Sequence, residues 1–165
     1  MLAQAIRKKL GKAVKEEKGF TLIELLAVIV IMGIIAIIAI PMISGLIKNT
    51  GDKADLATAR QVYEASRMYI TTELDGTIGT QTIDVIGTAA SGTTKATGLQ
   101  ALKFLETPLV LPSTKENIVT GSIIYYSNGK LADNSSGYAV MLKDSSTTPV
   151  VKTFTAEEIL ESKLK

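Results

Sequence analysis

The sequence lacks both cysteine and histidine across its 165 residues. Without cysteine the chain can form neither a disulfide bond nor a thiolate metal site. Without histidine it lacks the commonest general base and the usual nitrogen ligand of zinc, so Ser-His-Asp and Cys-His catalysis are excluded. An enzyme built from this chain would depend on carboxylates, lysine or tyrosine alone, and we therefore expect no catalytic residue, no metal site and no cofactor.

Charge is also missing from a long internal segment. No charged residue lies between Glu24 and Lys48, and residues 25–40 are apolar, one glycine included. With residues 20–23 added, this run reaches about 30 Å as a helix, which is the thickness of the hydrocarbon core of a bilayer. A helix satisfies its backbone polar groups within the segment, as lipid requires. The sequence therefore predicts one membrane-spanning helix, and the uncharged run continues to Ile47.

The basic residues are concentrated before this helix. Residues 1–19 contain six basic and two acidic side chains, whereas the rest of the chain carries a small negative charge. A basic segment before an apolar run follows the positive-inside rule, so we expect a cytoplasmic amino terminus and an outward carboxyl-terminal part. Binding to nucleic acid is a weaker explanation of the same charge.

Helical spacing returns after a polar break at residues 48–52. Apolar side chains then recur at the spacing of one helix face, while Arg60 and Arg67 lie on other faces. We expect one helix from about Phe20 to Leu74, apolar on all sides in its first half, amphipathic in its second, and ended by Asp75-Gly76. The predicted buried face carries Leu56, Ala59, Val62, Tyr63, Ser66, Tyr69 and Ile70.

Two residues interrupt the apolar half of this helix. Pro41 lacks a backbone N–H and clashes with the preceding turn, so it should bend or loosen the helix. Gly33 weakens the same region because it has no side chain to restrict its backbone. The sequence therefore predicts a weak zone between Gly33 and Pro41, although both residues are also tolerated in ordinary membrane helices.

The remainder of the chain alternates loop and strand signals. Residues 76–98 are rich in glycine, threonine, alanine and serine, which indicates a loop with one short strand at residues 82–86. The capping pattern from Thr97 to Gln100 predicts a short helix that continues to Leu105. Asp133 to Gly137 is read as a turn, because it lacks the alternating acids of a calcium loop.

Four strand-like runs occupy the carboxyl-terminal part, and Asn128-Gly129 between the first two is typical of a type I′ hairpin turn. The capping pattern from Thr155 to Glu158 predicts a short final helix. The predicted fold class is therefore α+β, with a long amino-terminal helix packed on an antiparallel β-meander. The four predicted strands are residues 122–126, 130–132, 137–143 and 150–154.

The segment Lys18-Gly19-Phe20-Thr21-Leu22-Ile23-Glu24, followed by the apolar run, resembles the class III signal peptide of type IV pilins and their relatives. The resemblance covers residues 18–47, and the rest of the chain is similar to the pilin architecture more loosely. It implies three parts: a cleaved leader at residues 1–19, a transmembrane and assembly half of the helix at residues 20–50, and a soluble head at residues 51–165.

The resemblance also implies roles for individual residues. A prepilin peptidase would cut between Gly19 and Phe20 and methylate the new amine of Phe20. Glu24, with Thr21 beside it, would serve assembly by meeting the amine of a neighbouring subunit. A charged side chain in a bilayer costs roughly 2.5 to 3.5 kcal/mol, so such an acid needs a partner. The stretch from Gly33 to Pro41 would melt on assembly, as in similar filaments.

The function implied by this resemblance is that of a structural subunit of a type IV pilus. Its partners would be further copies in a helical filament, the prepilin peptidase and an assembly platform in the membrane. The chain would be a single-pass membrane protein before assembly and part of an extracellular pilus afterwards. Whether such a filament serves adhesion, motility, competence or secretion is not written in these residues.

Three alternatives stay open. The chain could be a minor pilin or a pseudopilin of a type II secretion or competence system, where nucleic acid would be met only through DNA uptake. The apolar run could be a simple signal anchor. A membrane-anchored enzyme is disfavoured by the missing histidine and cysteine.

The lack of the carboxyl-terminal disulfide found in many relatives means that packing and backbone hydrogen bonds must hold the last strand and helix.

Overall fold

The computed structural model describes residues 20–79, 81–88, 91 and 97–161. The chain divides into two compact units, residues 1–45 and residues 46–165. The predicted leader, with Gly19, lies outside the described residues. The predicted division into leader, assembly half and head therefore stays a prediction.

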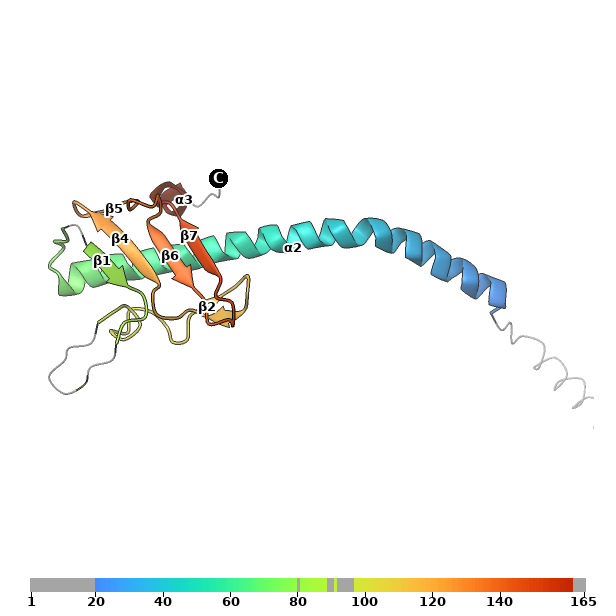
Figure 1. Cartoon of the computed structure of the whole chain (residues 1–165), viewed down its shortest axis with the longest axis horizontal. Helices are drawn as coiled ribbons and strands as arrows, with labels where there is room; N and C mark the ends of the chain where they lie inside the picture. Colours follow the sequence, from blue (N-terminus) through green and yellow to red (C-terminus); the bar gives the residue numbers. More distant parts are fainter. Residues whose placement is uncertain (1–19, 80, 89–90, 92–96, 162–165) are drawn as a thin grey trace, which may run out of the picture. The chain divides into compact units, whose positions relative to one another are not determined.

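The long helix predicted from the sequence is confirmed as α2 (Leu22–Glu73) (Figure 1). It continues through Pro41, so the weakening predicted there does not interrupt the helix. A proline removes one hydrogen bond of the ladder, and an otherwise unbroken helix can tolerate that loss. Melting of this stretch concerns an assembled filament and stays a prediction.

The carboxyl end of α2 is closed by a left-handed cap, as Asp75-Gly76 predicts. Asp75 and Gly76 have φ angles of 50° and 73°. The Gly76 N–H donates to the Ile70 carbonyl at 2.9 Å, which satisfies an acceptor left over at the helix end. The chain then reverses toward the sheet of the second unit.

The second unit contains an antiparallel sheet in the order β1-β4-β6-β7, with β5 extending the hairpin of β4 and a separate pair β2-β3. The four predicted strands are confirmed, and Asn128 and Gly129 adopt the positive φ angles, 51° and 76°, of a type I′ turn. The bounds are β1 (Gln81–Asp84), β2 (Val110–Leu111), β3 (Glu116–Asn117), β4 (Ile123–Ser127), β5 (Lys130–Leu131), β6 (Val140–Lys143) and β7 (Val151–Phe154).

Strand β1 is the short strand expected within the loop region, and it pairs with β4 along its whole length. Its partner strand β4 lies far from it in the sequence, and no pattern in the sequence predicted this pairing. The pair β2-β3 was not predicted either. Each of these strands has only two residues, which is too short to show an alternation of apolar and polar side chains.

The prediction of a helix at residues 97–105 is wrong, because this segment forms only a tight turn. The Gln100 N–H donates to the Val85 carbonyl at 2.9 Å, so the turn is tied to the chain that follows β1. The Gln100 side chain donates to the Glu106 carbonyl at 2.9 Å instead of capping a helix. Lys103 has a φ of 65°, and this left-handed conformation ends the turn.

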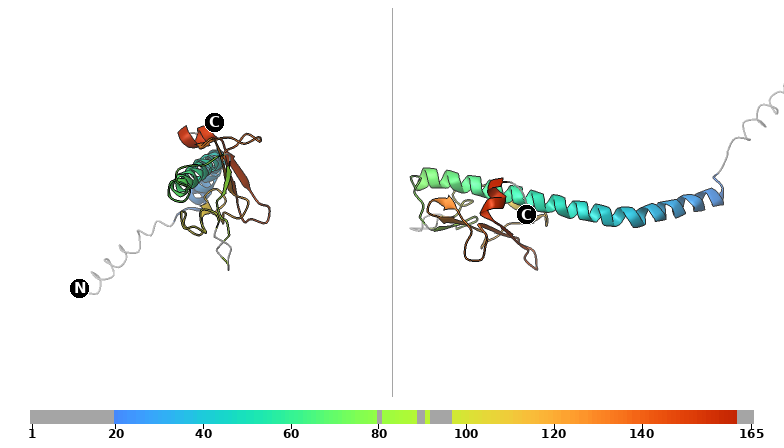
Figure 2. Two further views of the ribbon diagram at one scale, coloured as in Figure 1. Left: turned by 90° about the vertical axis from the view of Figure 1, so that its left-hand side faces the viewer. Right: turned by 90° about the horizontal axis from the view of Figure 1, so that it is seen from above.

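The sheet lies along one side of the second half of α2 (Figure 2). Ala59 and Val62 on the helix and Ile124, Val140 and Leu142 on the sheet are completely buried. Ser66 donates its hydrogen to the Tyr63 carbonyl at 2.6 Å, so Tyr126, whose hydroxyl lies 2.6 Å from the Ser66 oxygen, must donate to it. The predicted buried face of α2 is thereby confirmed as the helix side of the core.

The final helix α3 (Ala156–Glu161) is held without a disulfide. Thr155 and Glu158 form the predicted capping box: the Thr155 N–H donates to the Glu158 carboxylate at 2.9 Å, and the Glu158 N–H donates to the Thr155 hydroxyl at 3.2 Å. Asp133 accepts the Ala156 N–H at 2.7 Å, and Ile159 is completely buried. Capping, hydrogen bonding and packing therefore hold α3 in place.

Candidate functional site

The amino-terminal end of α2 is organised by Thr21 and Glu24. Glu24 Oε2 accepts the Thr21 N–H at 2.8 Å and the Thr21 hydroxyl at 2.9 Å, while the Glu24 N–H donates to Thr21 Oγ1 at 3.3 Å. This is a reciprocal capping box, in which side chains accept hydrogen bonds from backbone N–H groups that have no partner in the first turn of a helix. The predicted assembly residues Thr21 and Glu24 are therefore in direct contact.

The position of Glu24 suits a negative charge. It lies in the first turn of α2, where the helix dipole is positive and stabilises an anion. Phe20 is 87% exposed and lines a surface hollow together with Glu24, Leu25 and Val28. The structure thus brings Phe20 and Glu24 to one surface, and it gives the acid a partner within its own helix that the sequence analysis did not identify.

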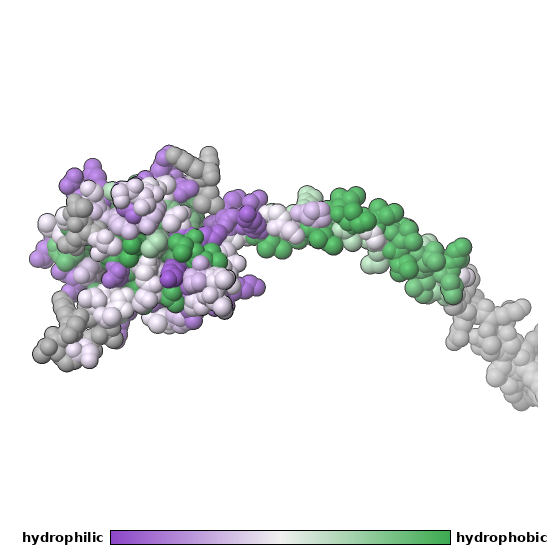
Figure 3. Space-filling view, viewed as in Figure 1, coloured by the Kyte–Doolittle hydropathy of each residue, from purple (hydrophilic) through white to green (hydrophobic). Residues whose placement is uncertain are grey.

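The apolar side chains that follow have no partner in the described part of the first unit. From Leu22 to Ile47 the large apolar side chains are between 52% and 84% exposed, which appears as the green surface in Figure 3. The helix is long and apolar enough to cross a membrane. A surface of this kind is stable in lipid or against other apolar helices, and unstable in water.

Gly33 lies within this surface, and a Cβ atom added to it would meet nothing within 4 Å. No contact among the described residues therefore requires a glycine at this position. Small residues on membrane helices let a second helix approach closely.

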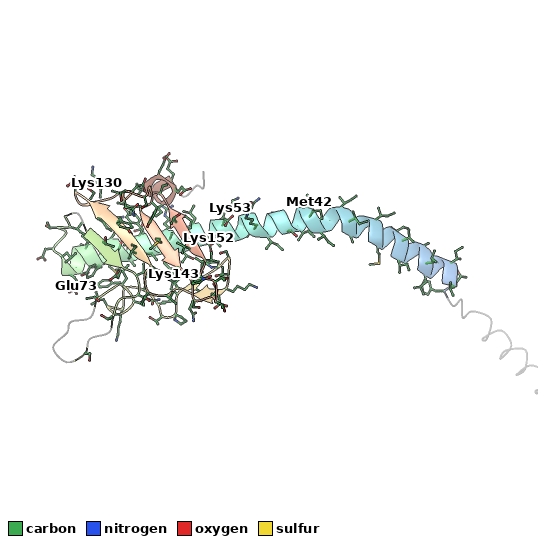
Figure 4. The ribbon with its side chains drawn as sticks, viewed as in Figure 1. Met42, Lys53, Glu73, Lys130, Lys143 and Lys152 are labelled. Carbon is green, nitrogen blue, oxygen red and sulfur yellow. The ribbon has the colours of Figure 1, made fainter. Side chains whose placement is uncertain are left out.

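A charged cluster at the start of the head half of α2 was missed by the sequence analysis. We define the Asp52–Asp55–Lys152 cluster by its ion pairs: Lys152 Nζ lies 2.6 Å from Asp52 Oδ1 and 3.4 Å from Asp55 Oδ2. Lys152 is labelled in Figure 4. Asp55 is completely buried and also accepts the Ser113 N–H at 2.9 Å. The cluster joins α2 to β7 and to the turn between β2 and β3.

The ion pair between Asp52 and Lys152 favours the charged forms of these two side chains. The hydrogen bond from Lys152 lowers the pKa of Asp52, and the same bond raises the pKa of Lys152 against the opposing effect of burial. A usable signal was present in the sequence, since Asp52 and Asp55 are three residues apart and so share one face of a helix. The sequence could not indicate that Lys152, 100 positions away from Asp52, completes the cluster.

A second buried acid, Asp144, closes the turn between β6 and β7. Burial raises its pKa, but hydrogen bonds from the Ser146 hydroxyl at 2.7 Å and the Val150 N–H at 2.8 Å outweigh burial and leave that pKa below its usual value. Ser146 and Val150 lie in the same turn as Asp144, which indicates a structural role. Among the described residues, no group of three acidic, histidine or cysteine side chains could hold a metal ion.

Comparison with protein families supplies one match: residues 14–40 fit the prokaryotic N-terminal methylation motif. The chain therefore carries the class III signal peptide of type IV pilins, as its sequence predicted. No curated protein and no solved structure matches it. The motif includes Gly19, Phe20, Thr21, Glu24 and Gly33, and it points to a structural subunit rather than an enzyme.

Proposed function

We propose that this chain is the polymerising subunit of a type IV pilus. The observation that carries the proposal is the combination of the methylation motif with an exposed apolar helix half in the same residues. In the membrane, lipid covers this half, and after assembly other copies of the chain cover it. Helical assembly needs an interface that repeats without closing, and a single rod-shaped apolar surface is suited to that purpose.

Processing at residues 19 and 20 would create the assembly site. Removal of the leader converts Phe20 into a new amino terminus, whose amine is positive at neutral pH. Phe20 and Glu24 are four residues apart, so this charge arises one helical turn from the carboxylate. We infer that the prepilin peptidase is the partner for this step and that it also methylates the amine.

Glu24 would select the register of each incoming copy. In the free subunit the Glu24 carboxylate accepts hydrogen bonds from the Thr21 N–H and hydroxyl. The acid therefore stays hydrogen-bonded while the subunit is in the membrane. In the filament the carboxylate would also meet the amine of a neighbouring Phe20. A misplaced copy would leave a buried charge without its partner, at a cost of roughly 3 to 5 kcal/mol, so the pair sets position more than it adds stability.

The decisive experiment replaces Glu24 and keeps the size of its side chain. We expect Glu24→Gln subunits to be cut at Phe20 and to remain in the membrane, with surface filaments reduced at least about tenfold, because 1.4 kcal/mol already corresponds to that factor. Glu64→Gln is the matched control, since Glu64 is an exposed acid on the head half of the same helix.

Mass spectrometry of sheared surface material from the wild type reads the mature amino terminus, its methylation and the abundance of the chain together. An abundant chain that begins at methylated Phe20 supports the proposal. A scarce chain with the same amino terminus indicates a minor pilin or pseudopilin instead. A surface protein that still begins at Met1, or normal filaments from Glu24→Gln, contradicts the proposal.

A further inference from the structure

The hydrogen bonds at the start of α2 set the residue at which the helix begins. Leu22 is its first residue, so Phe20 and Thr21 lie before the first turn. The Leu25 N–H donates to the Thr21 carbonyl at 3.2 Å, and the Glu24 N–H donates to the Thr21 hydroxyl at 3.3 Å. Thr21 is therefore the N-cap of α2, and the helix begins after Phe20.

The start of a helix decides which backbone carbonyl groups are free. In an α-helix each carbonyl accepts a hydrogen bond from the N–H four residues later. If α2 began one turn earlier, the Gly19 carbonyl would accept the Ile23 N–H. This carbonyl belongs to the bond that the proposed peptidase cuts, and hydrolysis needs its carbon open to water and its oxygen open to hydrogen-bond donors of the enzyme. A helix that continued through Gly19 would therefore protect the bond.

The residues before the proposed cut favour such a continuation by their composition. Residues 12–18 are lysine, alanine, valine and glutamate, most of which are strong helix formers. Gly19 opposes a helix because glycine has a large backbone freedom to lose. A glycine weakens a helix without fixing the residue at which it begins, whereas an N-cap satisfies donors at one defined position. The cap at Thr21 therefore holds the start of α2 at Leu22.

The hydrogen bonds of the capping box compete directly with a longer helix. Glu24 Oε2 accepts the Thr21 N–H at 2.8 Å and the Thr21 hydroxyl at 2.9 Å. In a helix continued toward the amino terminus, the Thr21 N–H would bond to the carbonyl of residue 17 and the Glu24 N–H to that of Phe20. Both N–H groups already have acceptors in the box, so each additional turn gains less than it would without the cap.

We propose that Thr21 and Glu24 are positioning residues for cleavage, because their capping box ends α2 and leaves the Gly19 carbonyl open to the peptidase. This inference rests on the proposed function, which places the cut between Gly19 and Phe20. Water adds to the Gly19 carbonyl carbon, the bond to the Phe20 nitrogen breaks, and that nitrogen takes up a proton and leaves as the new amine. Glu24 thereby acts before assembly, in a role that needs an acceptor oxygen and no charge.

Substitutions at Thr21 separate a cap from a direct contact with the peptidase. Thr21→Val keeps the shape of the side chain and removes the hydroxyl, whereas Thr21→Asn changes the shape and keeps a capping oxygen. Full-length chains are incubated in vesicles that contain the prepilin peptidase, and mass spectrometry measures how fast the product beginning at Phe20 forms. We expect Thr21→Val to be cut roughly fivefold more slowly, which corresponds to a cap of about 1 kcal/mol, and Thr21→Asn at the wild-type rate.

Substitutions at Glu24 separate the cap from the charge. Glu24→Gln keeps an acceptor oxygen and completes a capping box, whereas Glu24→Leu removes the acceptor. We expect Glu24→Gln to be cut at the wild-type rate and Glu24→Leu roughly fivefold more slowly, as for the loss of one hydrogen bond. Because both residues form one box, Thr21→Val combined with Glu24→Leu should be cut about as fast as either single variant. The matched control is Thr155→Ala, which removes the cap of α3 in the second unit and should leave the rate unchanged.

Trypsin provides a second measurement that does not depend on the binding subsites of the peptidase. It cuts after lysine, so the bond after Lys18 probes the same stretch of backbone one residue earlier. We expect this bond to be cut roughly fivefold more slowly in Thr21→Val, as for the loss of a cap, and at the wild-type rate in Thr21→Asn. Full-length chains in detergent are used, and mass spectrometry identifies each cut.

Three outcomes overturn the positioning role and leave the proposed function intact. One is an unchanged rate for Thr21→Val with both proteases. Another is slow cutting of Thr21→Asn by the peptidase but not by trypsin, which assigns the Thr21 hydroxyl to a direct contact with the peptidase. The third is slow cutting of Thr155→Ala, which assigns the effect to a general loss of stability. A wild-type chain that the peptidase leaves uncut at Phe20 contradicts the proposed function instead.

Discussion

The two halves of α2 share one secondary structure and differ in where their contacts lie. In the half from Leu22 to Ile47 the large apolar side chains are at least 52% exposed, whereas Ala59 and Val62 in the other half are completely buried. The second half packs its apolar face into the core of the second unit. In the first half the large apolar side chains are exposed, so the same helix is part of a packed core in one half and an exposed apolar surface in the other.

The acids of the two halves show the same contrast. Glu24 is exposed and bound to Thr21 within one helical turn, while Asp55 is buried and bound to groups from β7 and the β2-β3 turn. Loss of Asp55 should therefore lower the stability of the head. Loss of Glu24 removes the capping box at the start of α2 and should leave the fold of the head unchanged.

The largest expected effect comes from a matched pair of truncations, Leu56→Ala and Leu26→Ala. Leu56 is 5% exposed, so its truncation should lower the free energy of unfolding of the head by about 2 to 5 kcal/mol. Leu26 is 52% exposed, and its truncation should leave that free energy unchanged. Urea unfolding of both full-length variants in detergent measures the difference; equal losses would contradict the separation of the two halves.

The next effect tests the charged cluster through Lys152→Met. This change leaves the buried Asp55 carboxylate without its cation and should lower the free energy of unfolding by on the order of 3 kcal/mol. Lys53→Met is the control, because Lys53 is exposed on the same stretch of α2. A loss below that of the control would show that the Ser113 N–H alone satisfies Asp55.

A smaller effect is expected from Tyr126, whose hydroxyl lies between α2 and β4. Tyr126→Phe removes a buried hydrogen bond to Ser66 and should cost about 1 kcal/mol in thermal unfolding. Ser66 keeps its own bond to the Tyr63 carbonyl, so no buried donor is left over. A cost near 3 kcal/mol would show that the contact organises more of the core than this one bond.

The same side chain makes a prediction about alkaline pH. Burial raises the pKa of Tyr126 to about 12, whereas the pKa of a tyrosine in an unfolded chain is about 10. Between these values the folded chain holds a proton that the unfolded chain has lost, so stability falls as pH rises from about 10 to 12. Tyr126→Phe should flatten this decline in urea titrations, and an unchanged slope would refute the assignment.

The smallest effect compares the two capping boxes. Thr155→Ala should lower the free energy of unfolding of the head by about 1 kcal/mol, because it removes the cap of α3. Thr21→Ala removes the equivalent cap of α2 in the first unit and should leave the stability of the head unchanged. Calorimetry of the two variants measures this contrast, and a destabilised head in Thr21→Ala would contradict it.

Much of this fold could be predicted because its signals are local. The length of α2, the turn at Asn128-Gly129 and the cap at Thr155 each depend on residues within a few positions of one another. The helix expected at residues 97–105 failed because Gln100 bonds to Val85 and Glu106, and those longer contacts outweigh a local capping pattern. The candidate assembly residues were found from the motif, but the contact between Thr21 and Glu24 was not.

By itself, the sequence determined that this chain carries a membrane-length apolar helix with one acid near its start, because charge and hydropathy are properties of each residue in order. Tertiary structure alone decided that Asp52 and Asp55 meet Lys152, that β1 joins β4, and that Pro112 to Lys115 lie beside Leu46 and Ile47. These contacts join residues far apart in the chain. Their free energy depends on a packed core that brings them together, and no local pattern reports it.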